Sequence, residues 1–307
     1  MGPEPDKTVV TAAGVIRNPE WTAWNAMKEQ LDGRLKGMDA VRTRFERTGA
    51  EGMPPAYLLG FDLKGNGHVI LANGNPDTAD NTAVHVPGTT SRLAGAEGDI
   101  RRMQNLWDTS NQLAPDQTTA TITWIGYEAP QSTVPEAMEK HWAHDGAPKL
   151  NNFLDGLQTV QSGPDASHTT VVAHSYGSTT LGAAAQADGR IAADDLVVAG
   201  SPGMLVGDAG GLDVGKNHVW AEATHDDPVP LGGKVAGLGG HKWGVQTWHG
   251  LPYDADYIQT VPSDEAFGAR RMAVDTSGHS GYWDKDSVSL QNQAAVVTGR
   301  YNQVVEP

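Results

Sequence analysis

The sequence predicts an α/β fold in which a mostly parallel central sheet is covered by helices on both faces. Short apolar runs rich in β-branched residues begin near Ala56 and recur along the rest of the chain. The first two are close enough to form a hairpin, whereas several later ones are separated by helical stretches. Strands that alternate with helices pair in parallel and bury both faces of their sheet. The 37 glycines suit the many tight turns that such a fold needs.

The first 52 residues are expected to form a helical extension packed on the main domain. Residues 1–17 are polar and are expected to be loose, and a helix is predicted to begin at Asn18-Pro19-Glu20, a cap residue, a first-turn proline and an early acid. Apolar residues then recur every three or four positions at Trp21, Trp24, Met27, Leu31, Leu35, Met38, Val41 and Phe45. This pattern predicts one long helix, or two helices broken near Gly33 and Gly37.

Residues 53–307 are expected to form the main domain. A hairpin is predicted from Tyr57 to Phe61 and from Val69 to Ala72, with its turn at Lys64-Gly65-Asn66-Gly67. Further strands are predicted at 82–86, 120–125, 169–173, 195–199, 218–223 and 270–274, and helices at 91–107, 147–162 and 178–188. The segments 201–215 and 231–256 are rich in glycine or proline and are predicted to be long surface loops.

Charge and composition disfavour several classes of function. The net charge is −15 and no run of lysine or arginine forms a basic patch, which disfavours nucleic acids and anionic lipid as partners. No apolar stretch approaches the ~20 residues that span a bilayer. The first ten residues, MGPEPDKTVV, lack the regions of a signal peptide, and the compartment stays open because the chain could derive from a longer precursor.

The sequence also lacks the usual marks of metal and phosphate sites. There is no cysteine, so disulfides, thiolate metal sites and cysteine nucleophiles are excluded. None of the 11 histidines forms a helical His-x-x-x-His pair with an acid, and Gly60 to Gly67 lacks the lysine and helix of a phosphate-binding loop. We therefore expect no metal and no cofactor.

The strongest chemical signal is the segment Val171-Val172-Ala173-His174-Ser175-Tyr176-Gly177. A β-branched strand runs into a serine flanked by small residues, and a small-residue helix follows. Such a sharp turn exposes the serine hydroxyl above the sheet, and small residues two before and two after it let the backbone pass close to itself. Alanine stands at the first of these positions, where glycine is commonest. The segment predicts that Ser175 is a nucleophile.

A serine nucleophile needs a histidine that takes its proton, and an acid that orients the histidine. In this fold the acid and then the histidine follow the serine in the chain. His279, the last histidine, lies in a loop after the strand predicted at 270–274 and is the expected base. His241 and His249 compete from the glycine-rich loops before it, which we take for an insertion that shapes the pocket. His174 is expected to pack or to support the site, because its side chain should point away from that of Ser175.

Two adjacent aspartates, Asp226 and Asp227, follow the strand predicted at 218–223. Asp227 is the expected orienting acid, because Pro228 fixes the geometry of the residue before it. Asp226 is the alternative.

The developing oxyanion also requires hydrogen-bond donors. The expected donors are the backbone N–H of Tyr176 and that of Thr89, in the loop Val86-Pro87-Gly88-Thr89-Thr90-Ser91.

Taken together, these residues resemble a family of actinobacterial α/β-hydrolases long catalogued as proteins of unknown function. The similarity covers about residues 54–300 and includes 54–62, 84–90, Ala173-His174-Ser175-Tyr176-Gly177, Gly200-Ser201-Pro202-Gly203, Asp226-Asp227-Pro228 and Gly278-His279-Ser280. The resemblance implies an α/β-hydrolase fold for residues 53–307, a Ser175–Asp227–His279 triad, and an actinobacterial or associated phage source. It does not identify a substrate.

The expected activity is therefore that of a serine esterase, lipase-like, which cleaves a small-molecule carboxylic ester through an acyl-enzyme on Ser175. Acyl transfer, thioester cleavage and amide cleavage by the same triad are alternatives. A non-catalytic binding protein of the cell envelope that retains the fold is a further alternative, because fold alone does not prove activity. The oligomeric state is left open.

Overall fold

The computed structural model describes residues 1–161, 166–187, 191–248 and 251–307 and contains a central eight-stranded sheet. Within this sheet β4 runs antiparallel to both of its neighbours, β3 and β6, and the other neighbouring pairs are parallel. The predicted mostly parallel α/β fold is confirmed. In spatial order the strands are β12 (Arg270–Arg271), β9 (Val219–Glu222), β8 (Asp195–Ala199), β7 (His168–His174), β5 (Asn81–Val86), β6 (Thr119–Ile125), β4 (His68–Asn73) and β3 (Ala56–Asp62).

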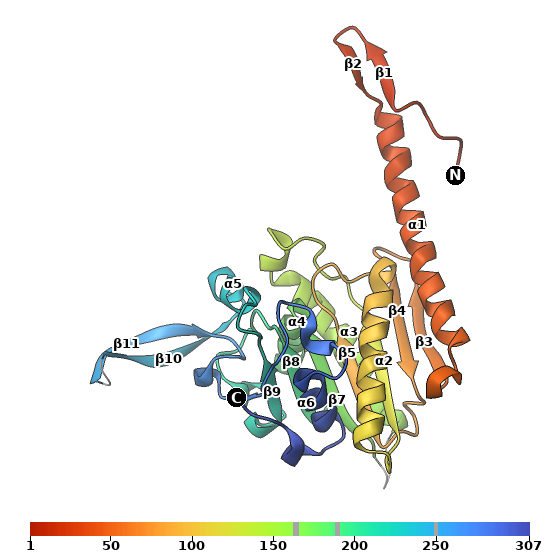
Figure 1. Ribbon diagram of the computed structural model, residues 1–307. Coiled ribbons are helices and arrows are strands. Elements are labelled where there is room, and N and C mark those ends of the chain that lie inside the picture. Colours follow the sequence, from red (N-terminus) through yellow and green to blue (C-terminus); the bar gives the residue numbers. More distant parts are fainter. Residues whose placement is uncertain (162–165, 188–190, 249–250) are drawn as a thin grey trace.

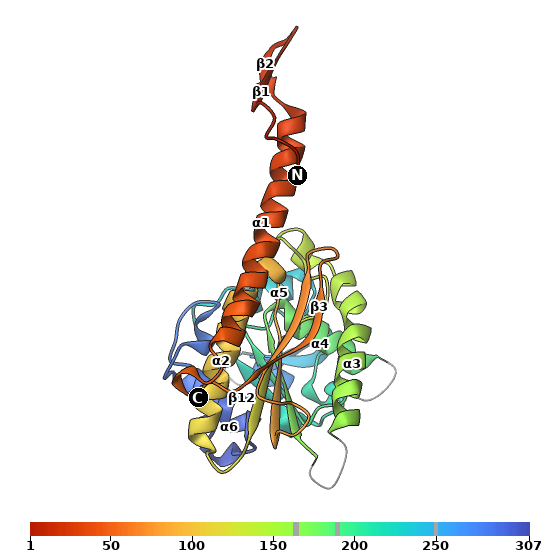
Figure 2. The ribbon, with the colours of Figure 1, turned by 90° about the vertical axis from the view of Figure 1, so that its right-hand side faces the viewer.

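Helices cover both faces of this sheet (Figures 1 and 2). On one face α3 (His141–Val160) and α4 (Tyr176–Gln186) pack on the strands, and on the other face lie α2 (Ala96–Leu113) and α6 (Val288–Val297). The strand residues alternate accordingly, since Val171 and Ala173 belong to the core under α3 and α4, and Val172 belongs to the core under α2 and α6. The central strands β7 and β8 therefore carry the runs Val171-Val172-Ala173 and Leu196-Val197-Val198-Ala199, as expected where a sheet is buried on both sides.

The N-terminal helix is continuous, as the apolar spacing allowed. Helix α1 (Pro19–Glu46) begins after Asn18, whose side chain accepts the backbone N–H of Glu20, and it runs through both glycines without a break. Gly37 instead permits a close approach, because a Cβ there would lie 2.2 Å from the backbone oxygen of Leu93. The end of α1 thus packs on the body of the molecule, while its first turns project away from it (Figures 1 and 2).

Two segments that were predicted to be irregular form regular secondary structure. Residues 1–17, expected to be loose, contain an antiparallel hairpin of β1 (Thr8–Thr11) and β2 (Gly14–Arg17) at the tip of α1. Residues 231–256, expected to be a surface loop, fall in α5 (Val229–Ala236) and in a second antiparallel hairpin of β10 (Gly240–Trp248) and β11 (Leu251–Thr260). Neither hairpin belongs to the central sheet.

No helix in the described part of the chain is long and apolar enough to cross a membrane.

The sheet brings five loops to one edge. The carboxyl ends of parallel strands meet at the same side of a sheet, and in α/β folds that side holds the ligand site. The segments that directly follow β5, β7, β8, β9 and β12 carry Thr89, Ser175, Gly200, Asp227 and His279, respectively.

Candidate active site

Ser175 occupies a strained turn between β7 and α4. Its backbone angles, φ 54° and ψ −132°, lie in a region that residues with side chains rarely adopt. The turn is held in place because the Ser175 N–H donates to the backbone oxygen of Ala199 on β8, at 3.0 Å. Such strain persists only where the surroundings impose it, and it commonly marks functional sites.

Two glycines allow the chain to pass close to this turn. A Cβ on Gly88 would lie 2.7 Å from the Cβ of Ser175, and a Cβ on Gly177 would lie 2.1 Å from the backbone oxygen of Val86. The loop after β5 therefore presses directly against the serine. These contacts explain why small residues are required around Ser175.

His279 is bound to Asp227. The distance from His279 Nδ1 to Asp227 Oδ2 is 2.8 Å, and the Asp227 side chain is fully buried. Because the carboxylate accepts, Nδ1 carries the proton, and Nε2 of the neutral ring is left to accept another. Of the two aspartates weighed from the sequence, Asp227 is the one bound to the His279 ring.

Two further donors fix the Asp227 carboxylate. The Tyr282 hydroxyl donates to Oδ2 at 2.7 Å, and the Val229 N–H donates to Oδ1 at 2.9 Å. Burial alone would raise the pKa of Asp227, but the hydrogen bonds from His279, Tyr282 and Val229 outweigh it and lower this pKa below its usual value. The acid therefore stays ionised beside the histidine. Tyr282 was not predicted as a site residue, although it is an aromatic residue three positions after His279.

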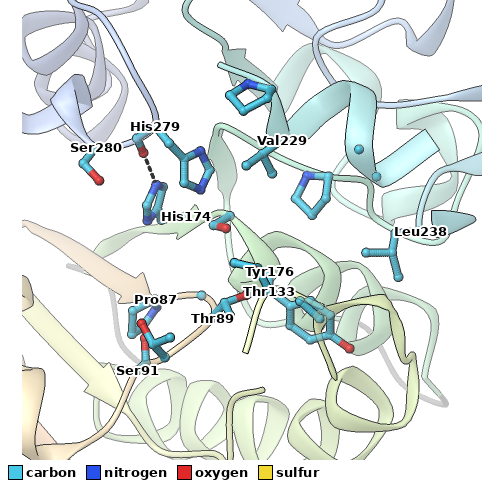
Figure 3. A pocket seen from close by; sticks show the side chains of 18 of the residues that line it. Pro87, Thr89, Ser91, Thr133, His174, Tyr176, Val229, Leu238, His279 and Ser280 are labelled. Atoms are coloured by element: carbon cyan, nitrogen blue, oxygen red, sulfur yellow. Dashed lines mark hydrogen bonds between the residues drawn. The ribbon is translucent and has the colours of Figure 1, made fainter. Parts of the chain in front are cut away.

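The other histidines lie in different settings. His174 is buried, and its Nε2 donates to the backbone oxygen of His279 at 2.7 Å, with the two rings 4.6 Å apart (Figure 3). Burial, with the nearby Arg102 charge, holds the pKa of His174 well below its usual value, so this residue is a neutral support for the loop that carries His279. His241 is exposed on β10, where its Nε2 lies 3.2 Å from Gln259 Nε2, and it does not line the cavity described below. His249 lies outside the described residues.

The loop after β5 is anchored from two sides. The Tyr127 hydroxyl donates to the backbone oxygen of Pro87 at 2.8 Å, and the Thr90 N–H donates to that of Pro130 at 2.7 Å. These two hydrogen bonds hold the loop where Gly88 contacts Ser175, and Thr89 follows directly after Gly88. Tyr176 begins α4, so its N–H is one of those that have no partner within a helix.

These residues surround one cavity of about 990 Å³. Ser175, His279, Thr89 and Tyr176 all line it, and most other lining residues are aliphatic or glycine (Figure 3). Asp99 and Arg102 also line the cavity. They form an ion pair in which Arg102 Nη1 lies 2.9 Å from Asp99 Oδ1. Among the described residues no cluster of histidine and acidic side chains could hold a metal ion.

Comparisons with known proteins identify the family of the chain. A family described as alpha/beta hydrolase matches residues 62–236, more than half of the chain. Two uncharacterized proteins of Mycobacterium tuberculosis, from strains CDC 1551 and H37Rv, are each 32% identical over an alignment of 260 residues that covers 80% of this chain and 39% of theirs. The chain thus spans about two fifths of the length of these relatives.

Similar solved structures include two esterases. One from Pyrobaculum calidifontis is 12% identical and matches with a TM-score of 0.48 over 89% of this chain and 93% of its own. The esterase LipW from Mycobacterium marinum is 10% identical, with a TM-score of 0.45 over 89% of this chain and 90% of its own.

Proposed function

Since this chain belongs to the alpha/beta hydrolase family, we propose that it is a serine hydrolase that cleaves carboxylic esters through an acyl-enzyme on Ser175. The observation that carries the proposal is the hydrogen bond between Asp227 and His279 at the cavity that Ser175 also lines. An ionised acid fixes Nδ1 as the protonated nitrogen, which leaves Nε2 to act as the base. A strained serine at the start of a helix is the remaining component of such a site.

In the proposed mechanism His279 Nε2 takes the proton of the Ser175 hydroxyl as its oxygen attacks the ester carbonyl. The tetrahedral intermediate then collapses, the bond to the alcohol breaks, and His279 returns the proton to the departing alcohol. Water attacks the acyl-enzyme in the second half of the cycle, with His279 again accepting and then returning a proton. Asp227 stabilises the imidazolium that forms in each half.

The oxyanion of the intermediate would be bound by the backbone N–H groups of Thr89 and Tyr176. Both residues line the cavity, and the contact between Gly88 and Ser175 places the Thr89 loop directly against the nucleophile. The start of α4 adds a favourable partial positive charge at this point. Removing one donor of this kind typically costs about 10²–10³ in kcat.

A fluorophosphonate probe tests the proposal directly, because it labels only a serine that is activated as a nucleophile. We expect wild-type protein to be labelled on the peptide that contains Ser175, and Ser175→Ala to remain unlabelled. Ser280→Ala is the matched control, since Ser280 lines the same cavity and should not affect labelling. Absence of label on folded wild-type protein would contradict the proposal.

A further inference from the structure

Helix α5 presents two aliphatic side chains at the mouth of the cavity. Leu231 and Val235 lie one helical turn apart and line the cavity, yet they are 69% and 81% exposed. A surface helix normally turns its apolar side toward the protein and its polar side toward water. Helix α5 has the reverse arrangement, and its apolar side faces the space next to the site.

The opposite side of α5 is firmly attached, so this orientation is set by packing. Gly233 lies against the body, where a Cβ would come within 1.8 Å of the backbone oxygen of Pro202. The neighbouring Lys234 pairs with Asp264 at 2.7 Å. Any rotation of α5 that buried Leu231 would break both contacts.

A second segment adds two more aliphatic side chains to the same opening. Val134 and Met138 line the cavity and are 71% and 42% exposed. This segment is also held in place, because the Gln131 side chain donates to the backbone oxygen of Ser91 at 3.1 Å and the Tyr176 hydroxyl donates to that of Glu139. We call Val134, Met138, Leu231 and Val235 the apolar rim.

The apolar rim leaves a large hydrophobic area in water. Removing such side chains from water stabilises a complex, so a ligand that covers the rim gains affinity from it. The cavity of about 990 Å³ is at the upper end of the range of roughly 300–1,000 Å³ typical of small-molecule sites. The charged pair on its wall, Asp99 and Arg102, is already joined and offers no free charge to an ionic acyl group.

We propose that the apolar rim and the cavity wall behind it bind the aliphatic chain of the acyl group, so that the preferred substrates are medium- or long-chain esters. The inference rests on the proposed function and narrows it to a substrate class. Val229 and Leu238 also line the cavity (Figure 3) and are less exposed than the rim, so they add buried aliphatic surface to it. Each methylene buried there should raise kcat/KM by up to about fourfold until the cavity is filled.

The experiment measures kcat/KM on p-nitrophenyl acetate and p-nitrophenyl decanoate, each at concentrations where the ester is monomeric. The wild-type protein is expected to favour the decanoate by at least a hundredfold. The double variant Leu231→Gln, Val235→Gln should lower the decanoate-to-acetate ratio by tenfold or more. The control Leu35→Gln, which changes a 58% exposed leucine on α1 away from the cavity, should keep the wild-type ratio.

These measurements distinguish failure of the acyl-chain site from failure of the proposed serine hydrolase activity. A wild-type ratio near one, or a double variant that keeps the wild-type ratio, overturns the acyl-chain site. In that case fluorophosphonate labelling at Ser175 would leave the serine hydrolase proposal standing. Absence of both labelling and ester cleavage would overturn the two together.

Discussion

The Asp226 carboxylate accepts the backbone N–H of Gly278 at 2.8 Å, one residue before the histidine that its neighbour Asp227 binds through the ring. The two adjacent aspartates thus hold the same loop at adjacent points. Asp227 is buried and contacts the ring of His279, whereas Asp226 stays at the surface and contacts only backbone there. We therefore expect the two residues to differ sharply in their effect on catalysis.

Asp227→Asn should lower kcat for ester hydrolysis by about 10⁴, because an amide in this position favours the wrong tautomer of His279. Asp226→Asn should cost less than tenfold, since the asparagine oxygen can still accept the Gly278 N–H. Steady-state kinetics on one p-nitrophenyl ester would compare the two. Equal losses would indicate a shared acidic site, and the reverse order would assign the orienting role to Asp226.

Ser175→Ala should abolish ester hydrolysis, with a loss on the order of 10⁵ or more in kcat, as expected when the serine of a triad is removed. The variant should still fold, because the substitution removes only the hydroxyl and the backbone can keep its φ of 54°. Turnover and thermal unfolding would be measured on the same preparation. A folded variant that keeps a tenth of wild-type turnover would end the serine hydrolase proposal.

Gly200→Ala should disrupt the Asp227–His279 pair. The added Cβ would lie 2.7 Å from Asp227 Oδ2 and 2.9 Å from His279 Nδ1, so one partner must move. Displacement of a catalytic group by about 1 Å can cost roughly 10² in rate, and we expect a loss of kcat of at least that size.

Gly299→Ala is the matched control for this substitution. Gly299 has a similar φ of +65° against +58° at Gly200, and a Cβ there meets nothing within 4 Å. Both variants should lose about 1–2 kcal/mol of stability from the left-handed backbone conformation. If both also lose activity equally, backbone strain rather than the clash at the site is responsible.

The sequence predicted the parts of the site that depend on local pattern. A β-branched run before Ser175 and small residues after it are sufficient to predict the strand, the turn and the helix. The pairing of His279 with an aspartate followed from chain order, and Pro228 favoured Asp227 over Asp226. The first and last of these inferences use residues that are close together in the chain, and the pairing with His279 uses only the order of the residues along it.

The parts that could not be predicted depend on contacts between distant segments. Tyr282 reaches Asp227, and Gly200 leaves room for the same pair, only because separate loops converge at one edge of the sheet. Helix α5 was predicted to be a loop because its two central glycines are poor helix formers, and packing of Gly233 on Pro202 overrides that preference.

Glu222, at the end of β9, should make the stability of the protein depend on pH. The side chain is almost fully buried, and its Oε2 accepts from Ser289 Oγ and Gln293 Nε2 on α6, each at 2.9 Å. Burial, only partly offset by these two hydrogen bonds, raises the pKa of Glu222 from 4.5 to about 8. The folded protein therefore keeps a proton at neutral pH that the unfolded chain has lost.

This difference in bound protons sets the direction in which the free energy of unfolding changes with pH. Between about pH 4.5 and pH 8 the folded state binds more protons at this position than the unfolded state, so the free energy of unfolding falls as pH rises through that window. The total loss is on the order of a few kcal/mol. Glu222→Gln removes the titrating group, and its free energy of unfolding should fall less between pH 5 and pH 8 than that of the wild type.

Urea unfolding at pH 5, 6, 7 and 8 measures this difference, with Glu97→Gln as the control at an exposed position on α2. His168 also makes a contribution to stability that weakens with rising pH. Burial would lower its pKa, but the hydrogen bonds to Asp195 and to the Val297 backbone, together with the nearby carboxylate charges, outweigh burial and raise it. That contribution is common to the wild type and to both variants, so it cancels when their pH profiles are subtracted. The difference profile should therefore isolate Glu222, and parallel profiles for wild type and Glu222→Gln would show that this carboxyl is ionised in the folded protein across the whole range.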